Sequence, residues 1–385
     1  MGYLQIMDRT IVHLDLDSFF VSVERLLNSK LIGLPVIIGG TSDRGVVASC
    51  SYEARAFGVH SAMPIKMAKY LCPQALFIKG DYEQYEKHSS IVTQIIRDKS
   101  PVFEKASIDE HYVDISGMDR FFGCLKWTKE LRQSIIKESG LPISFGLSIN
   151  KTVSKIATSE SKPNGELEIK PDFVKPFLNP LSVSKIPMVG EKTAKHLRSM
   201  GIFSIQNLGS FPIKMLEKVL GENGKSIWLK ANGIDNNPVE PYSERKSISK
   251  ETTFQQDTTD VIKIHEILIG MIEELAFQLR KEKKLVSVVT VKIRYSNFDT
   301  HTEQIKIPYT SSDHVLIQTA SKLFDKLYSR RMLIRLIGVR LTGLVSGHYQ
   351  INLFEDSGEM VSLYQTMDKI RLRFGDKAVG RAVCF

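Results

Sequence analysis

The stretch from Ala106 to Ile115, which reads ASIDEHYVDI, places two adjacent carboxylates in a run that otherwise has the pattern of a β-strand. Adjacent acids repel each other, and burying them is costly unless cations compensate their charge. The stretch therefore indicates either a divalent-metal site or a polar turn between two strands. Alternation along a strand would send Asp109 and Glu110 to opposite faces. A shared metal site consequently requires a turn just before Asp109.

A second acidic strand lies near the N-terminus. Apolar and polar residues alternate with period two over residues 10–17, which directs three polar side chains away from the core: His13, Asp15 and Asp17. Two carboxylates on one surface make a second candidate for the metal site, and an ordinary half-exposed strand is the alternative. Ser18 is then expected to cap a helix over Phe19–Leu27.

The composition is that of a folded, basic protein. At 385 residues, with 42% hydrophobic and 25% charged residues, the chain is long enough for two to four domains with ample core. The formal net charge of +9 suits a polyanionic partner. Nucleic acid is the commonest such partner, although charge alone does not distinguish it from an anionic membrane or from simple solubility.

Cysteine spacing and hydropathy indicate the compartment. The four cysteines lie far apart and form no CxxC pair: Cys50, Cys72, Cys124 and Cys384. We expect reduced thiols in a cytoplasmic protein rather than a disulfide framework or a zinc site. The N-terminus lacks a signal-peptide pattern, and no apolar run of about 18 residues occurs, so we expect neither secretion nor a membrane span.

The order of the expected elements defines the fold class. Over residues 10–170 the patterns follow a split β-α-β-β-α-β order, with helices expected at Tyr82–Lys99, at 125–139 and at 152–160. This order predicts a ferredoxin-like antiparallel sheet backed by helices. Residues 18–76 form an insertion after the first strand. Within it, Tyr52 and Arg55 are spaced so that both can reach one anion, although such pairs are also common on surfaces.

The segment after the sheet is helical. At 186–197 a glycine hairpin joins two helices and presents backbone N–H groups that suit one phosphate, with a plain helical turn as the alternative. Residues 234–246 are rich in Asn, Pro and charge, as in an interdomain linker.

A basic domain follows the linker. Residues 245–345 contain 17 Lys and Arg against 11 Asp and Glu, which is two-thirds of the excess charge of the chain. We expect helices near 261–283 and 313–330, and strands at 286–294 and 334–344. The strands place basic side chains on one sheet face, which suits a surface that lines a nucleic-acid groove. A basic face that is exposed to solvent and binds no ligand is the alternative. The last forty residues open with a short peptide, QINLF, at 350–354.

Two acidic strands in a split sheet, together with a basic C-terminal domain, indicate the palm of a nucleotidyl transferase. Five ordered motifs then carry a resemblance: DLDSFF at 15–20, SYEAR at 51–55, SIDE at 107–110, KPNG at 162–165 and the hairpin at 186–197. Over about residues 10–345 the chain closely resembles the Y-family translesion DNA polymerases of the DinB, or DNA polymerase IV, type. The resemblance implies an α+β multidomain fold and template-directed, error-prone DNA synthesis without a proofreading exonuclease.

The resemblance also implies domain boundaries. The palm would comprise residues 1–17 and 77–166, with small fingers at 18–76. A helix-hairpin-helix thumb would follow at 167–233, then the linker at 234–246 and an α/β little finger at 247–345. Residues 346–385 would be a C-terminal tail with a clamp-binding peptide.

By the same resemblance, Asp15, Asp109, Glu110 and the backbone carbonyl of Leu16 would hold two Mg²⁺ ions, with Mn²⁺ as a substitute. Such ions activate the primer 3′-hydroxyl and neutralise the leaving pyrophosphate. The residues implied to bind the incoming dNTP are Phe19, Phe20 as the steric gate against ribonucleotides, Ser49, Tyr52, Arg55 and Lys162. A core aromatic on the helix is the alternative for Phe20. Asp17 and Asp114 are expected to be structural.

The implied contacts with primer–template DNA come from the thumb hairpin and the basic domain: Val189, Gly190, Lys192, Thr193, Lys292, Arg294, Arg335 and Arg340. The peptide at 350–354 resembles the one by which bacterial polymerases dock on the sliding clamp, through Gln350, Leu353 and Phe354. We expect a monomer.

Two other function classes remain as alternatives. A non-catalytic DNA- and clamp-binding scaffold would have lost the metal ligands, whereas Asp15, Asp109 and Glu110 are all present. A palm-type nucleotide cyclase would share the acidic sheet but needs neither a thumb hairpin nor a basic domain.

Overall fold

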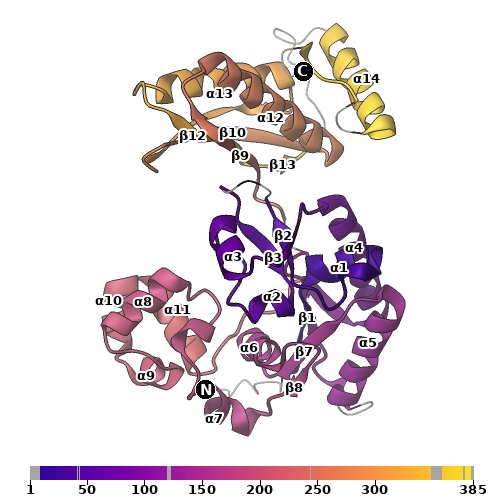
Figure 1. Cartoon of the computed structure of the whole chain (residues 1–385), viewed down its shortest axis with the longest axis vertical. Coiled ribbons are helices and arrows are strands. Elements are labelled where there is room, and N and C mark those ends of the chain that lie inside the picture. Colours follow the sequence, from indigo (N-terminus) through magenta and orange to yellow (C-terminus); the bar gives the residue numbers. More distant parts are fainter. Residues whose placement is uncertain are drawn as a thin grey trace, which may run out of the picture. The chain divides into compact units, whose positions relative to one another are not determined.

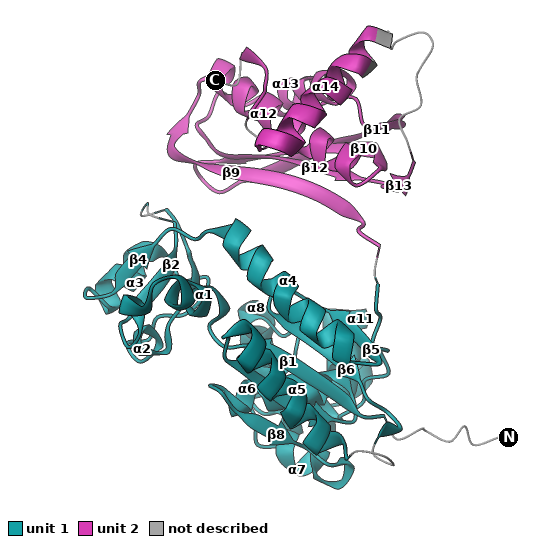
Figure 2. Cartoon of the chain, turned by 90° about the vertical axis from the view of Figure 1, so that its right-hand side faces the viewer, with its two compact units in different colours: residues 1–243 teal, residues 244–385 magenta. Residues whose placement is uncertain are grey.

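The computed structural model describes residues 9–40, 42, 44–118, 123–242, 244–347, 358–375 and 378–382. The chain divides into two compact units, residues 1–243 and 244–385 (Figure 2). In the described parts of the chain, no helix is both long and apolar enough to cross a membrane.

A five-stranded sheet forms the centre of the first unit. Its strands are β1 (Ile11–Leu16), β5 (Val102–Lys105), β6 (Glu110–Asp114), β7 (Ile143–Ser148) and β8 (Glu166–Glu168), in the order β5-β6-β1-β7-β8. β1 runs antiparallel to both β6 and β7. The first four strands have the ferredoxin-like arrangement that the sequence predicts. The short edge strand β8, parallel to β7, is an addition that the sequence analysis missed.

Helices α4 (Tyr82–Lys99) and α5 (Cys124–Ser139) cover one face of this sheet (Figure 2). Val12, Leu14 and Leu16 of β1 point into that core, with at most 1% of each side chain exposed. Burying one such side chain contributes about 1.5–3 kcal/mol. The alternating pattern of β1 is therefore explained by a core on one face only, which leaves His13 and Asp15 on the other.

The other face carries helix α6 (Lys151–Ser161), which begins where the Asn150 side chain accepts a hydrogen bond from the Val153 N–H. α6 lies against β7 at Gly146, where a Cβ atom would overlap the main chain of Ser154 and Thr158. Glycine is thus required for this close approach. The approach places the side chains of α6 directly over β1 and β6.

The predicted turn before the paired acids is present. β5 and β6 form a hairpin in which Lys105 faces His111, and the N–H groups of Ala106 and Ser107 donate to the carbonyl of Glu110. Asp109 lies in this turn and Glu110 is the first residue of β6. The two adjacent carboxylates therefore escape strand alternation.

The segment between β1 and α4 contains a small sheet of its own. Its strands β2 (Val36–Gly39), β3 (Val47–Cys50) and β4 (Leu76–Ile78) pair in the order β3-β2-β4, accompanied by α1 (Phe19–Leu27), α2 (Tyr52–Arg55) and α3 (Ile65–Leu71). The expectation that Ser18 caps α1 is wrong. Its φ of 42° turns the backbone into the left-handed region, and its buried hydroxyl has no hydrogen-bond partner.

Five helices follow the palm sheet: α7 (Val174–Leu178), α8 (Glu191–Ser199), α9 (Ile205–Ser210), α10 (Ile213–Leu220) and α11 (Glu222–Ala231) (Figure 1). Their core is continuous with Val153, Ile156 and Ala157 of α6. The start of the expected linker is fixed to the palm, because Asp235 accepts hydrogen bonds from Thr152 and Val239 is buried.

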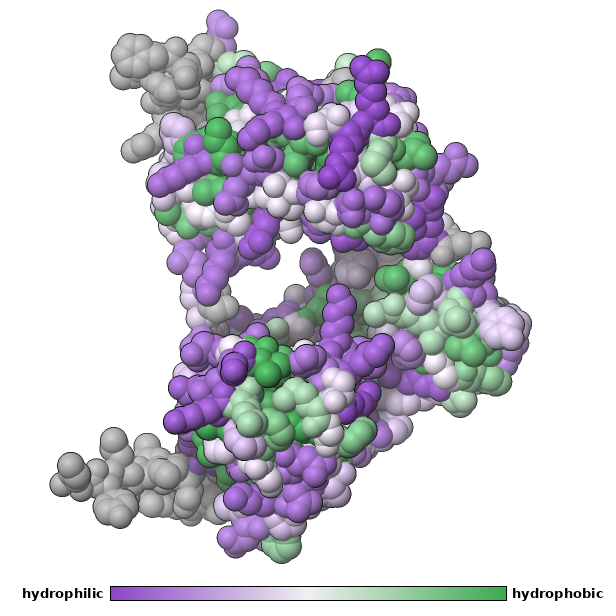
Figure 3. Space-filling model, turned by 90° about the vertical axis from the view of Figure 1, so that its left-hand side faces the viewer, coloured by the Kyte–Doolittle hydropathy of each residue, from purple (hydrophilic) through white to green (hydrophobic). Residues whose placement is uncertain are grey.

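The second unit is a sheet with helices on one face. β9 (Ser247–Thr258), β10 (Lys284–Tyr295), β11 (Thr300–Thr310) and β12 (Ile334–Thr342) pair in the order β11-β10-β12-β9, and β13 (Val345–Ser346) pairs with β10. α12 (Val261–Lys281) and α13 (Asp313–Leu327) pack on the apolar face as predicted. The sequence analysis missed β9 and β11, which are rich in Thr, Gln and charged residues. Hydrophilic side chains cover much of the surface that this unit presents in Figure 3.

The described part of the expected tail is folded onto this unit. Helix α14 (Gly358–Phe374) buries Tyr364 and Arg371, each with 4% exposed. Arg280 of α12 forms ion pairs with both Asp368 of α14 and the fully buried Asp313. Residues 358–374 are therefore an integral helix of the second unit rather than a free tail.

We predict that Gly146→Ala lowers the free energy of unfolding by about 2 kcal/mol, because the new methyl group overlaps the main chain of α6. Gly209→Ala in α9 is the matched control: its Cβ would stand 3.4 Å from Asn232, and alanine favours the helix. Denaturant titration of both variants measures the difference. Equal stability of the two would show that α6 does not depend on this contact.

Candidate active site

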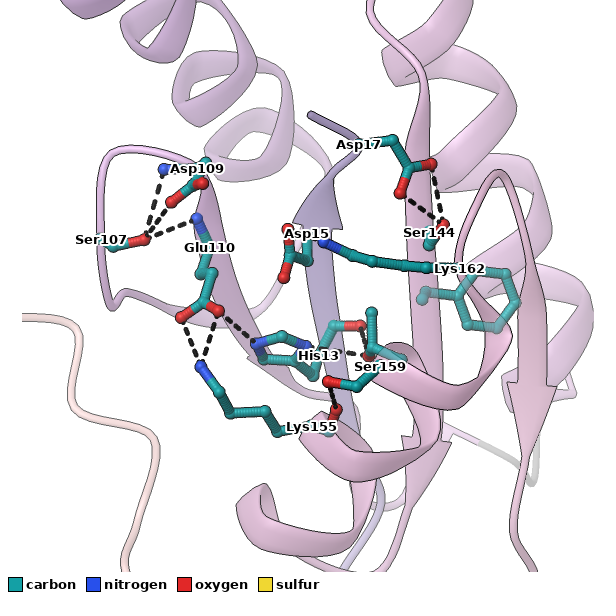
Figure 4. A network of polar contacts seen from close by, with 12 residues as sticks. His13, Asp15, Asp17, Ser107, Asp109, Glu110, Ser144, Lys155, Ser159 and Lys162 are labelled. Atoms are coloured by element: carbon teal, nitrogen blue, oxygen red, sulfur yellow. Dashed lines mark hydrogen bonds and ion pairs between the residues drawn. The ribbon is translucent and has the colours of Figure 1, made fainter. Parts of the chain in front are cut away.

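The ends of the two central strands bring the predicted acids together. Asp15 and Glu110 are paired across β1 and β6. One ligand atom each from His13, Asp15 and Glu110 lies within 4.8 Å of the others (Figure 4). The three come from the sheet face that α6 only partly covers, and they form a compact group of two carboxylates and one imidazole.

Two lysines neutralise these carboxylates. Lys162, which follows α6, places Nζ 2.5 Å from Asp15 Oδ1. Lys155, within α6, donates to both oxygens of Glu110 at 2.6 Å (Figure 4). Lys162 was among the predicted residues, whereas Lys155 was missed. In the sequence, Lys155 is recognisable only as a lysine one turn into the helix that follows a buried strand. That pattern is too common to indicate a site residue.

Asp15 is the carboxylate most affected by its surroundings. Burial raises its pKa to about 7; Lys162 opposes this shift, and the negative charges of Glu110 and Asp109 add to it. A carboxylate in this position gains strongly from any nearby cation. The site therefore favours the binding of further positive charge.

His13 is neutral in this setting. Burial lowers its pKa well below the ordinary value, and the positive charges of Lys155 and Lys162 lower it further. Its Nδ1 lies 2.8 Å from the Thr158 hydroxyl, while Nε2 has no hydrogen-bond partner and lies 3.9 Å from Glu110 Oε1. The sequence analysis placed His13 on this face without assigning it a role. His13 Nε2 could therefore serve as a metal ligand beside the carboxylates of Asp15 and Glu110.

Asp109 stands outside this group. Its Oδ1 accepts a hydrogen bond from Ser107 Oγ at 2.6 Å, and the same hydroxyl accepts from the N–H groups of Asp109 and Glu110. Ser107 thus fixes the turn that carries both acids (Figure 4). The structure places Asp109 beside the cluster, on the turn that leads into Glu110.

Asp17 connects three segments. Its carboxylate accepts hydrogen bonds from Ser144 Oγ on β7, from the Asn164 N–H and, at 3.3 Å, from the Tyr52 hydroxyl. Tyr52 belongs to α2 and Asn164 to the turn after Lys162. Asp17 thus connects Tyr52 to the turn that carries Lys162; that its role is purely structural stays a prediction.

The remaining predicted nucleotide residues surround this end of the sheet. Arg55 is exposed and lies 5.4 Å from the Tyr52 ring, and Ser49 is buried in β3. Phe20 stacks on Tyr85 with ring centroids 4.2 Å apart and an 11° tilt. Phe19 packs in the core with 3% exposed, so its side chain is turned away from any nucleotide.

The predicted DNA contacts lie in two places. In the helical segment, Gly190 directly precedes α8 and provides no side-chain cap for the first turn, which includes Lys192 and Thr193. In the second unit, Lys292 and Arg294 lie on the half-exposed side of β10, and Arg340 faces Thr290 on the same side. Arg335 sits at a register shift, over the Phe298 ring.

The predicted clamp residues Gln350, Leu353 and Phe354 lie outside the described residues.

The donor set fits a hard divalent cation. Carboxylate oxygens are the ligands that Mg²⁺ and Mn²⁺ prefer, and Asp15 and Glu110 supply them from two neighbouring strands. His13 Nε2, which has no hydrogen-bond partner among the described residues, lies beside them. Lysines that reach these carboxylates can also reach the phosphates of a bound nucleotide. A ferredoxin-like sheet with this site at the ends of its central strands defines a palm-type nucleotidyl transferase.

Comparison with known proteins is consistent with this class. The profile of the impB/mucB/samB family matches residues 14–159, and that of its C-terminal domain matches residues 245–353. A DNA polymerase IV of Dehalococcoides mccartyi is 38% identical over 96% of both chains. A DNA polymerase IV of Streptococcus pneumoniae is 38% identical over 88% of this chain and 97% of its own.

Solved structures agree. The Y-family DNA polymerase chimera Dbh-Dpo4(243-245)-Dbh matches with a TM-score of 0.79 at 29% identity, over 87% of this chain and 99% of its own. The insertion ternary complex of Dbh DNA polymerase matches with a TM-score of 0.63 at 28% identity, over 89% of this chain and 100% of its own. The chain therefore belongs to the impB/mucB/samB family and is a Y-family translesion DNA polymerase of the DinB type.

Proposed function

We propose that this chain extends a DNA primer with dNTPs through the carboxylate site at the ends of β1 and β6. The observation that carries the proposal is the group formed by Asp15 and Glu110, with Lys162 and Lys155 bonded to them. Acidic ligands bordered by lysines suit a reaction in which negative charge develops on a leaving pyrophosphate.

Asp15, Asp109 and Glu110, with the Leu16 carbonyl, would hold two Mg²⁺ ions, and Mn²⁺ would substitute. Bound there, the ions supply activation of the 3′-hydroxyl and neutralisation of phosphate charge. Asp109 directly precedes Glu110 on a turn fixed by Ser107, and its negative charge acts on Asp15. The chain itself supplies the oxygen donors and holds their backbone in place.

Tyr52, Arg55 and Lys162 would bind the triphosphate. Asp17 holds the Tyr52 hydroxyl and the Asn164 N–H, so the fingers residue and the turn that carries Lys162 keep a constant spacing. Arg55 is exposed beside the Tyr52 ring, with Nε donating to the Cys50 carbonyl, whereas Lys162 already points to the carboxylates. Charge-assisted hydrogen bonds from these groups orient the nucleotide for in-line attack.

Phe20 would act as the steric gate. Its ring is clamped flat against Tyr85, whose own hydroxyl donates to Glu24 at 2.6 Å. A ring fixed in this way cannot move aside for a 2′-hydroxyl. Ser49 would lie near the incoming base, and Phe19 would contribute through its main chain.

The other assignments complete the proposal. Residues 1–17 and 77–166 would act as the palm, 18–76 as fingers, 167–233 as thumb and 247–345 as little finger, with the hairpin and the basic face of β10 and β12 binding primer–template DNA. The protein would act as a monomer in the cytoplasm, in keeping with the buried thiols of Cys50, Cys72 and Cys124. Error-prone synthesis without proofreading would follow from the small fingers.

Residues 350–354 would dock on a sliding clamp. Clamp binding by the full chain and by a chain without these five residues tests this assignment, and equal binding would reject it.

We predict that Asp109→Ala abolishes primer extension, with a loss of at least ~100-fold, because the site loses one of three anionic ligands. Extension of a labelled primer on a defined template with Mg²⁺ and dNTPs measures it. Asp114→Asn is the matched control, since Asp114 lies at the other end of β6, where its side chain accepts hydrogen bonds from Ser116. Synthesis by Asp109→Ala at the wild-type rate would remove the metal assignment.

We also predict that Phe20→Ala raises ribonucleotide incorporation relative to deoxyribonucleotide incorporation by at least ~10-fold, because the ring no longer occupies the space beneath the sugar. The ratio of kcat/KM for rGTP and dGTP opposite a template C reports it. Phe103→Ala, a half-buried palm aromatic, controls for loss of packing. Unchanged sugar discrimination in Phe20→Ala would reject the gate.

A further inference from the structure

A cavity of about 300 Å³ lies in the first unit, apart from the carboxylate group. Tyr112 of β6 forms one wall, and the start of α6 contributes Lys151 and Thr152. Pro187 and Lys230 line it from the helical segment. The cavity therefore joins the palm sheet to the thumb helices.

Lys230 is unusual among the groups that line this cavity. It belongs to α11, and only 9% of its surface is exposed. In the described part of the chain its one hydrogen-bond partner is the sulfur of Met188 at 3.5 Å, and it forms no ion pair with a carboxylate. Sulfur is a weak acceptor. Lys230 is thus a buried lysine without a counter-charge, and an anionic ligand in the cavity would supply the missing partner.

Of the other three charged groups that line the cavity, Lys151 and Asp235 have partners. Lys151 donates to Glu104 at 2.5 Å. Asp235 accepts from the N–H and hydroxyl of Thr152 through one oxygen and from Asn237 through the other, so it caps α6. The Glu240 side chain is exposed to solvent. Among the described lining residues, Lys230 is thus the buried charge without an ion pair, whereas the Glu240 carboxylate, for which no ion pair is found either, is exposed to solvent.

The position of the cavity indicates the ligand. Tyr112 lies two residues beyond Glu110 on the same face of β6, a step of about 7 Å. On the opposite side, Pro187 and Met188 lead directly into the hairpin at Val189 and Gly190. The cavity therefore lies between the site assigned to the primer 3′-end and the hairpin assigned to duplex phosphates.

We propose that this cavity receives a backbone phosphate of the primer strand, with Lys230 as the cation that pairs with it. The inference rests on the proposed function, and it adds a binding residue that neither the hairpin nor the basic sheet face contains. A phosphate oxygen would replace the Met188 sulfur as the partner of Nζ. One neutralised phosphate releases about one counterion, so the contact has a measurable salt signature.

The test compares Lys230→Gln with Lys225→Gln, an exposed lysine on the same helix. Fluorescence anisotropy of a labelled primer–template is recorded between about 50 and 200 mM salt. We expect Lys230→Gln to bind at least ~5-fold more weakly and to lower the slope of log K against log salt by about 1. Lys225→Gln and Lys230→Arg should keep the DNA affinity and the salt slope of the wild type. An unchanged slope for Lys230→Gln would overturn the proposal.

Melting temperature and nucleotide kinetics separate the rival roles. Removing an uncompensated buried charge should leave the melting temperature of Lys230→Gln unchanged or higher. A lower melting temperature with normal DNA affinity would show a structural role and overturn the proposal. A raised KM for dNTP with normal DNA affinity would assign the cavity to a nucleotide phosphate and also overturn it.

The two proposals fail in different ways. If the wild-type chain neither binds nor extends a primer–template, the proposed function is wrong. If the wild-type chain binds and extends it, and Lys230→Gln does the same with an equal slope, only the cavity assignment is wrong.

Discussion

Four carboxylates crowd the end of the palm sheet, and their compensation is the constraint on which the site depends. Asp15 and Glu110 are paired across two strands, Asp109 precedes Glu110, and Asp17 lies just beyond β1. Lys162 and Lys155 offset the closest pair, while Ser107 and Ser144 supply hydrogen bonds to the other two. Without these partners the mutual repulsion of the four carboxylates would destabilise this arrangement.

Both lysines depend on one helix. α6 can carry Lys155 to Glu110 and deliver Lys162 to Asp15 only because Gly146 lets the helix lie on β7. The same helix shares its apolar side with the thumb core, and its N-terminus is capped by Asp235 from the segment that leads toward the second unit. One element thus links charge compensation at the acids to the thumb and to the linker.

The sequence allowed the acidic strands, the long helices and the turn before Asp109 to be predicted, because each has a local pattern. Apolar residues recur at every second position in β1 and at helical spacing in α4 and α12, as expected for elements that bury one side. Lys155 and His13 could not be assigned, since their roles arise only when α6 folds over the sheet. β9 and β11 were missed because their exposed faces are polar. The capping role predicted for Ser18 was wrong because its backbone adopts the left-handed conformation.

The docking of α14 was equally invisible to local patterns. Its attachment relies on ion pairs between residues far apart in sequence, such as Arg280 with Asp368 and Arg371 with Glu273. A linker composition likewise gave no sign that residues 235–240 lie fixed against the palm. Long-range polar contacts of this kind become visible only in three dimensions.

Binding of Mn²⁺, followed by electron paramagnetic resonance with primer–template and a non-hydrolysable dNTP analogue present, tests the central claim most directly. If the acids at the ends of β1 and β6 are the metal site, Asp15→Asn should bind Mn²⁺ at least ~10-fold more weakly than the wild type. Asp114→Asn, which changes an acid at the far end of β6, should bind as the wild type does. Equal Mn²⁺ affinity of Asp15→Asn and the wild type would contradict the account.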